Sequence, residues 1–150
     1  MIRLLTGSTH TGKTLLAQRL LERHGAPYLS IDHLKMGLIR SGMCPLTPES
    51  TDEALTAVLW PVVREIVKTA VENGQSLTVE GCYIPFNWRE DFDASCLPHI
   101  RFLCLVFSEA YIRTRFDTIQ THANAIERRK DDSFCTMELL LAENQRNLEA

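Results

Sequence analysis

The stretch that decides the fold is Gly7-Ser8-Thr9-His10-Thr11-Gly12-Lys13-Thr14. It matches the pattern G-x-x-x-x-G-K-[ST] in full. It also stands between a short apolar run at 2–6 and a helical pattern at 13–24, as this pattern requires. The two fixed glycines permit backbone angles that other residues avoid, so main-chain N–H groups can face a phosphate. All eight residues of this phosphate loop are therefore predicted to bind a nucleotide.

Three side chains of the phosphate loop carry individual expectations. Lys13 can reach the β- and γ-phosphates as a point charge, and the Thr14 hydroxyl can bind Mg²⁺. The N-terminus of the helix that follows adds a partial positive charge. His10 stands where a small residue is usual, and its ring is expected either to face solvent or to hydrogen-bond a bound phosphate.

Outward from the loop, short apolar runs alternate with helical patterns, which is typical of a parallel sheet covered by helices. Strands are expected at 2–6, 27–31, 77–79 and 100–107, and helical patterns occupy 13–24, 32–40, 55–71, 112–126 and 137–148. This order predicts a three-layer α/β fold with about four parallel strands. From Phe102 to Phe107 the last run is apolar without interruption, which predicts a strand covered on both faces.

Composition restricts the class of protein. The 150 residues carry 16 Lys+Arg and 19 Asp+Glu, a formal charge of −3, which suits one domain at 1–150 and argues against a nucleic-acid backbone as partner. No apolar run approaches the roughly 20 residues of a membrane span, and no targeting segment is visible. The five cysteines form no C-x-x-C pair, which favours reduced thiols in a cytoplasmic protein.

Two carboxylates follow expected strands and are candidates for chemistry. Asp32 can be a general base for an acceptor hydroxyl, with a helix N-cap as the simpler role. Glu80 ends an apolar strand, where it can hold Mg²⁺ through water or bind the acceptor, with a structural salt bridge as the alternative. Tyr83 and the aromatic residues after it can wall an acceptor pocket or merely pack under a loop.

Arginines gather in the last third of the chain. Arg113 and Arg115 are expected to stabilise the transferring phosphoryl group, and Arg128 and Arg129 to contact the nucleotide. For the latter pair, simple solvation at a helix C-terminus is an equally good explanation.

With these residues in place, the chain resembles P-loop kinases of the nucleoside and nucleotide kinase type, including adenylate kinase, shikimate kinase, zeta-toxin and 2-phosphoglycerate-kinase-like proteins. The phosphate loop is the specific part of this resemblance. The acidic residue and the cation of Asp32-His33-Leu34-Lys35 are similar to the acceptor-binding segment of adenylate kinases, and Arg40 is a second candidate cation. The resemblance implies the P-loop NTPase fold, ATP and Mg²⁺ as cofactors, and a lid at about 109–132.

The chain also departs from adenylate kinases. Where those carry Asp-Gly-Phe-Pro-Arg, this chain has Glu80-Gly81 without the arginine, which argues against a nucleoside monophosphate acceptor. The fifth strand that usually follows the lid is not evident. The leading hypothesis is an ATP- and Mg²⁺-dependent kinase that phosphorylates a small molecule at a hydroxyl or phosphate group. The alternatives are a nucleotide-dependent switch or hydrolase that acts on a protein partner, and a nucleotide-binding remnant without turnover.

Overall fold

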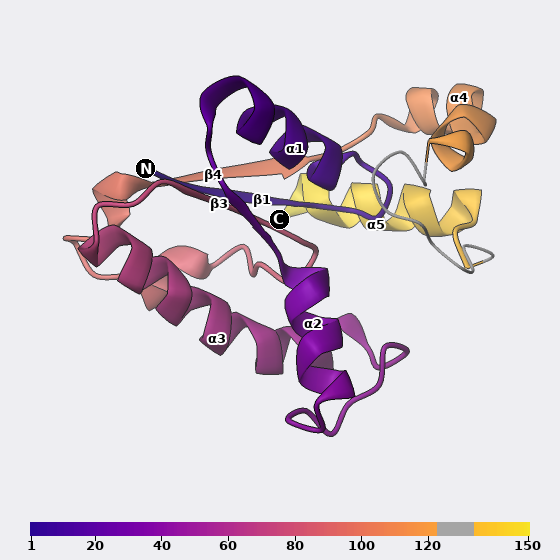
Figure 1. Ribbon diagram of the computed structural model, residues 1–150. Coiled ribbons are helices and arrows are strands. Elements are labelled where there is room, and N and C mark those ends of the chain that lie inside the picture. The colour runs from indigo at the N-terminus through magenta and orange to yellow at the C-terminus, as the bar shows by residue number, and fades with distance from the viewer. Residues whose placement is uncertain (123–133) are drawn as a thin grey trace.

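The computed structural model describes residues 1–122 and 134–150 and shows helices and strands in the predicted order (Figure 1). The strands are β1 (Ile2–Gly7), β2 (Tyr28–Ser30), β3 (Leu77–Glu80) and β4 (Ile100–Leu105). The helices are α1 (Lys13–His24), α2 (Ile31–Arg40), α3 (Asp52–Glu72), α4 (Glu109–Thr121) and α5 (Met137–Glu149), and two short 3-10 helices, η1 (Trp88–Asp91) and η2 (Leu97–His99), precede β4.

The described strands form one parallel sheet in the order β2-β3-β1-β4. The predicted α/β fold with four parallel strands is therefore confirmed. Because β1 lies between β3 and β4, the phosphate loop leaves the middle of the sheet. Leu5 of β1 pairs with Glu80 at the end of β3, which brings this carboxylate to the same edge as the loop. In open parallel sheets this carboxyl edge is where ligands bind.

The main core lies between the sheet and α3. The long helix buries a stripe at helical spacing, Leu55, Leu59, Val63, Val67 and Ala70. This stripe packs with Ile2, Leu4 and Val79 of the sheet. Figure 1 shows α1 on the opposite side of the strands from α3, so the sheet is the middle of three layers. The amphipathic pattern of α3 is thus explained by its position against one face of the sheet.

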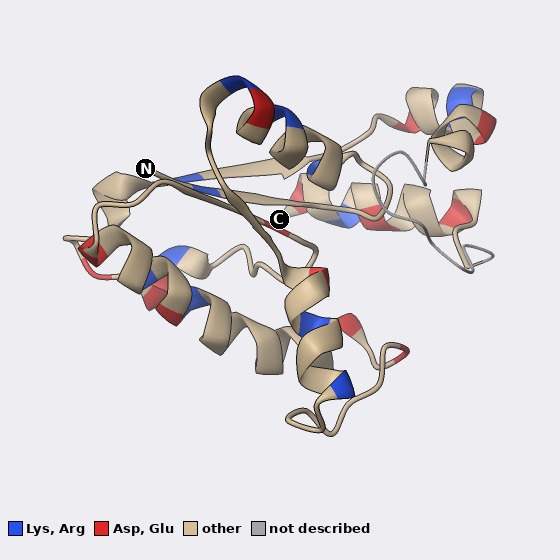
Figure 2. Ribbon diagram, viewed as in Figure 1, with Lys and Arg blue, Asp and Glu red and all other residues tan. Residues whose placement is uncertain are grey.

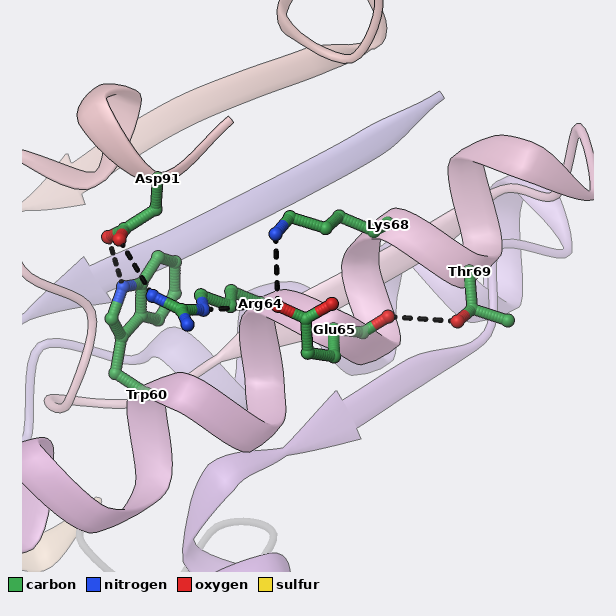
Figure 3. A network of polar contacts seen from close by, with 6 residues as sticks. All are labelled: Trp60, Arg64, Glu65, Lys68, Thr69 and Asp91. Atoms are coloured by element: carbon green, nitrogen blue, oxygen red, sulfur yellow. Dashed lines mark hydrogen bonds and ion pairs between the residues drawn. The ribbon is translucent and has the colours of Figure 1, made fainter. Parts of the chain in front are cut away.

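A polar network fixes η1 against α3 (Figure 3). Trp60 Nε1 donates to Asp91 Oδ2 at 2.7 Å, and Arg64 Nη1 donates to Asp91 Oδ1 at 2.9 Å. The Asp91 carboxylate therefore accepts a hydrogen bond from the nearly buried Trp60 indole and forms an ion pair with Arg64. Arg64 and Lys68 also contact Glu65, an exposed residue on the outer face of α3. This network ties the segment before β4 to the helix under the sheet.

The prediction that the last strand is covered on both faces is wrong. Among the described strands β4 lies at the edge of the sheet, and Leu103 is 48% exposed, whereas Leu5, its register partner on β1, is buried. A run of apolar residues cannot by itself distinguish a central strand from an edge strand. The strand expected at 27–31 is also shorter, because Ile31 already begins α2.

The C-terminal third forms a second, smaller core. Ile112 and Ile119 of α4 pack with Leu140 of α5 and with Cys135. The helical pattern expected at 112–126 is described only as far as α4 extends. In the part of the chain that the structure describes, no helix combines the length and the apolar character that crossing a membrane would need.

Candidate functional site

The phosphate loop has the backbone geometry that its glycines predict. Gly7 has φ 139°, and a Cβ on it would overlap the main-chain carbonyl of Leu105 on the neighbouring strand. Gly12, directly before α1, has φ 84°. His10, with φ 63°, is the one non-glycine residue with positive φ within residues 1–122 and 134–150. The loop therefore turns sharply at three positions before it enters the helix.

Side chains of the loop hold its main chain in this shape. Lys13 is buried, and its Nζ donates to the carbonyl oxygens of Gly7 at 3.1 Å and Ser8 at 2.7 Å. Thr11 Oγ1 donates to the same Ser8 carbonyl at 2.8 Å. The Lys13 ammonium thus lies across the loop, at the N-terminus of α1. A cation and a helix N-terminus in one place form a site suited to a phosphate.

Thr14 and Glu80 meet at the carboxyl edge of the sheet. Thr14 Oγ1 donates to Glu80 Oε2 at 3.3 Å, and Glu80 is only 1% exposed. Mg²⁺ prefers oxygen ligands and is commonly held by one or two protein oxygens together with substrate phosphates. This hydroxyl and carboxylate, next to the phosphate loop, fit such an ion.

Asp32, Lys35 and Tyr83 form a second polar group. Lys35 Nζ donates to Asp32 Oδ1 at 2.6 Å and to Tyr83 Oη at 2.9 Å. Burial alone would lower the pKa of Lys35, but the Asp32 carboxylate and the hydrogen bonds to both partners raise it above its usual value. Burial is also the main reason that the pKa of the Tyr83 hydroxyl is raised. Lys35 is therefore a cation at neutral pH, and the Tyr83 hydroxyl, whose oxygen accepts from Lys35, keeps its own proton.

The N-cap role expected for Asp32 is wrong. Ser30 holds the cap position of α2, and Asp32 is already the second residue of the helix. The carboxylate is instead partly exposed and paired with Lys35 on the next turn. This position leaves one face of Asp32 open to a ligand.

A single cavity of about 1300 Å³ joins these groups. Its lining contains the predicted loop and acceptor residues Gly7, Ser8, Thr9, His10, Gly12, Lys13, Thr14, Asp32, Lys35, Arg40, Glu80 and Tyr83. Residues that sequence reasoning placed on separate segments thus share one volume. Cys82 lines it as well, and burial raises the pKa of its thiol, so this cysteine is a poor nucleophile there.

Two of the predicted arginines, Arg113 and Arg115, are not brought to this cavity. Arg113 donates through Nε to Glu109 Oε1 at 2.8 Å on the exposed face of α4, and Arg115 lies at a non-helical kink of the same helix. Neither lines the cavity in the described structure. Arg128 and Arg129 lie outside the described residues. The catalytic and nucleotide-binding roles of these four residues stay predictions, as does the lid at about 109–132.

The sequence analysis missed the contribution of α5. Glu143, Arg146 and Asn147 of this helix line the cavity together with His122, at the end of α4, and Phe134. Asn147 Nδ2 donates to Ser8 Oγ at 2.9 Å, and the Thr9 N–H donates to Glu143 Oε2 at 3.2 Å. Glu143 and Asn147 are one turn apart, which was a readable signal of a polar face. Nothing local in the sequence indicated that this face meets residues 8 and 9.

The ring of His10 has a partner inside the loop. Its Nδ1 lies 2.8 Å from Thr9 Oγ1. The ring also borders the cavity. This arrangement differs from a ring that simply faces solvent, the first of the two expectations for His10.

No protein-family model matches this chain, and no curated protein matches it. Solved structures do. A “putative kinase” from Chloroflexus aurantiacus j-10-fl is 22% identical, with a TM-score of 0.55 over 97% of this chain and 78% of that one. A chain of the Pnkp1/Rnl/Hen1 RNA repair complex is 13% identical, with a TM-score of 0.57, and this chain spans 45% of its length. A gluconokinase from Sinorhizobium meliloti 1021 is 19% identical over 98% of this chain and 93% of that one, with a TM-score of 0.48.

At these identities the comparisons establish a shared fold. The α/β architecture with a four-stranded parallel sheet is the fold that this chain shares with the “putative kinase” and with the chain of the RNA repair complex. What the chain does must be argued from its own site.

Proposed function

We propose that this chain is a small-molecule kinase that transfers the γ-phosphoryl group of ATP to a hydroxyl or phosphate of an acceptor. The observation that carries this proposal is the shared cavity: the phosphate loop, Glu80 and Asp32 line one volume at the carboxyl edge of a parallel sheet. A volume of about 1300 Å³ exceeds that of a typical single-ligand pocket. It is therefore large enough for a nucleotide and a small acceptor side by side.

The proposed step is an in-line phosphoryl transfer. For a hydroxyl acceptor, its oxygen forms a bond to the γ-phosphorus while the bond from that phosphorus to the β–γ bridging oxygen breaks, and ADP leaves with the electron pair. The acceptor proton passes to the Asp32 carboxylate. Lys35 holds this carboxylate in place through the 2.6 Å contact, and the loop N–H groups and Lys13 stabilise the charge on the phosphates.

Thr14 and Glu80 are the residues proposed to hold Mg²⁺. When bound, the ion neutralises phosphate charge and orients the transferring group. The Thr14 hydroxyl and the Glu80 carboxylate, the two oxygen ligands proposed for the ion, are 3.3 Å apart. Glu80 is proposed to bind the ion directly or through a water molecule, and its almost complete burial restricts the orientation of its carboxylate.

The part of the cavity lined by α2 and by Tyr83 is proposed to bind the acceptor. Lys35 and Arg40 supply positive charge from α2, and Tyr83 supplies a hydroxyl donor from the segment after β3. Arg113 and Arg115 are proposed to stabilise the transferring phosphoryl group, and Arg128 and Arg129 to contact the nucleotide, as parts of a lid at about 109–132. A lid over the site would exclude water from the transferring group.

The test is ADP release measured with a panel of sugars, nucleosides, antibiotics and phosphorylated acids. We expect release that depends on one acceptor class and that falls by about 10²- to 10⁴-fold in Asp32→Asn, because a positioned general base contributes about that much. The control Glu72→Gln also removes one carboxylate charge, at the end of α3 and outside the cavity lining, and should leave the rate unchanged. Thermal unfolding of each variant confirms that the fold is kept.

The alternatives give different results. Acceptor-independent release that Asp32→Asn does not slow would indicate a hydrolase or switch and remove the role assigned to Asp32. ATP binding without release under any condition would indicate a remnant without turnover.

A further inference from the structure

The C-terminal helix α5 is fixed at the end of β4 by a buried amide. Asn144 is 2% exposed, its Oδ1 accepts from the Phe107 N–H at 2.7 Å, and its Nδ2 donates to the Leu140 carbonyl at 2.7 Å. Leu140, one turn earlier, is fully buried against α4. These contacts determine which face of α5 lies toward the rest of the domain.

The same face continues onto the phosphate loop. Glu143 and Asn147, at i and i+4, both contact the first half of the loop. Asn147 Nδ2 donates to the Ser8 hydroxyl, whereas Glu143 Oε2 accepts from the main-chain N–H of Thr9. The two contacts differ in kind. One uses a side-chain hydroxyl, and the other uses a main-chain N–H group, the type of donor with which this loop motif cradles phosphates.

The negative charge of Glu143 is the property that bears on phosphate binding at this N–H group. A carboxylate and a phosphate oxygen are both anionic acceptors, and both are attracted by main-chain N–H groups and by a helix N-terminus. Figure 2 shows acidic segments on both sides of the single basic segment of α5, which is Arg146. Glu143 is the acidic residue of this helix that lines the cavity.

We propose that Glu143 sets the nucleotide affinity of the phosphate loop by competing with the phosphates for it. Bound phosphate must displace the carboxylate from the Thr9 N–H or tolerate a like charge beside it. Either way, Glu143 weakens binding in proportion to the charge of the nucleotide. Asn147 and Asn144 keep α5 in place without adding charge. This inference rests on the proposed binding of nucleotide phosphates to the loop.

The competition has a measurable signature. At separations of about 5 Å and an effective dielectric constant between about 80 for water and about 20 near a protein surface, like charges cost enough to change affinity by about 4- to 300-fold. Removal of the Glu143 charge should therefore tighten ATP binding by a factor in this range. The affinity for ADP should rise less than that for ATP, the affinity for AMP should rise less again, and the affinity for adenosine should not change. A purely structural role for Glu143 would not produce this order.

The experiment is calorimetric titration of ATP, ADP, AMP and adenosine into the full chain, into Glu143→Gln and into Glu138→Gln. Glu138 lies in the first turn of α5 and outside the cavity lining, so its variant removes the same charge from the same helix without touching the loop. We expect tighter binding in Glu143→Gln, graded by phosphate number, and unchanged binding in Glu138→Gln. A second variant, Glu143→Ala, should behave like Glu143→Gln if charge is the cause.

The failure of this inference is distinguishable from failure of the proposed function. If the unmodified chain binds ATP and Glu143→Gln binds it equally or less tightly, Glu143 is not a competitor, and the nucleotide site stands. If none of the three proteins binds any phosphate-bearing nucleotide, the nucleotide site itself is wrong and the inference falls with it.

Discussion

At the scale of single residues, Gly7 shows how the loop depends on the sheet. It ends β1 with φ 139°, and its missing side chain leaves room for the Leu105 carbonyl of β4. The motif requires glycine here for close approach of a phosphate, and the structure adds a second requirement from the neighbouring strand. The sequence pattern could predict the first requirement but not the second, because residues 7 and 105 are far apart in the chain.

Gly7→Ala should therefore destabilise the whole domain as well as the loop. We expect the free energy of unfolding in urea to fall by about 2–4 kcal/mol, from backbone strain together with steric overlap. Gly37→Ala is the matched control, because a Cβ at this position in α2 meets nothing within 4 Å. Alanine is the better helix former, so this control should gain about 0.5–1 kcal/mol. Equal effects at the two positions would contradict the close approach seen at Gly7.

The polar group around Lys35 marks a limit of sequence reading at the same scale. The spacing of Asp32 and Lys35 on one helix allows an i, i+3 contact, and both residues were candidates for the acceptor site. The third member, Tyr83, comes from the segment after β3, and its hydrogen bond to Lys35 could not be predicted from local pattern. The residue types could be identified from the sequence, whereas their hydrogen-bond partners depended on the fold.

At the scale of elements, the Trp60–Asp91 contact joins α3 to η1 (Figure 3). Asp91→Ala would leave the nearly buried indole N–H without this acceptor and would remove the Arg64 ion pair. We expect the free energy of unfolding to fall by about 1–3 kcal/mol, with a change in tryptophan fluorescence. Glu65→Ala removes an exposed carboxylate of α3 that also pairs with Arg64, and it should leave the unfolding midpoint nearly unchanged. Equal losses in the free energy of unfolding would show that the Trp60–Asp91 contact stabilises the fold no more than an exposed carboxylate does.

Helices were easier to predict than strand environments. The stripe of α3 repeats every three to four residues over its whole length, so its existence and its buried face followed from the pattern. The run at 100–107 has no period, and its place at the sheet edge depends on which strands pair beside it. α5 was predicted as a helix, but its contact with residues 8 and 9 crosses more than 130 positions of sequence.

At the scale of the whole molecule, the cavity is an assembly of strand ends and helix faces. The phosphate loop follows β1, Glu80 ends β3, Asp32 lies in the first turn of α2, and α5 lines the cavity next to the loop. The parallel sheet places the first three together because its carboxyl ends share one edge. This part could be anticipated from the strand order. The position of α5 could not, because no rule of sheet topology fixes it.

The phosphate loop is proposed to bind the phosphates of ATP through Lys13, and the affinity of Lys13→Ala for Mg-ATP measures this contribution. Lys68→Ala is the control, since it also removes one ammonium group but lies on α3 and outside the cavity lining. We predict that Lys13→Ala binds about 10- to 100-fold more weakly and that Lys68→Ala binds as the unmodified chain does. An unchanged affinity in a folded Lys13→Ala variant would show that Lys13 does not bind the phosphates.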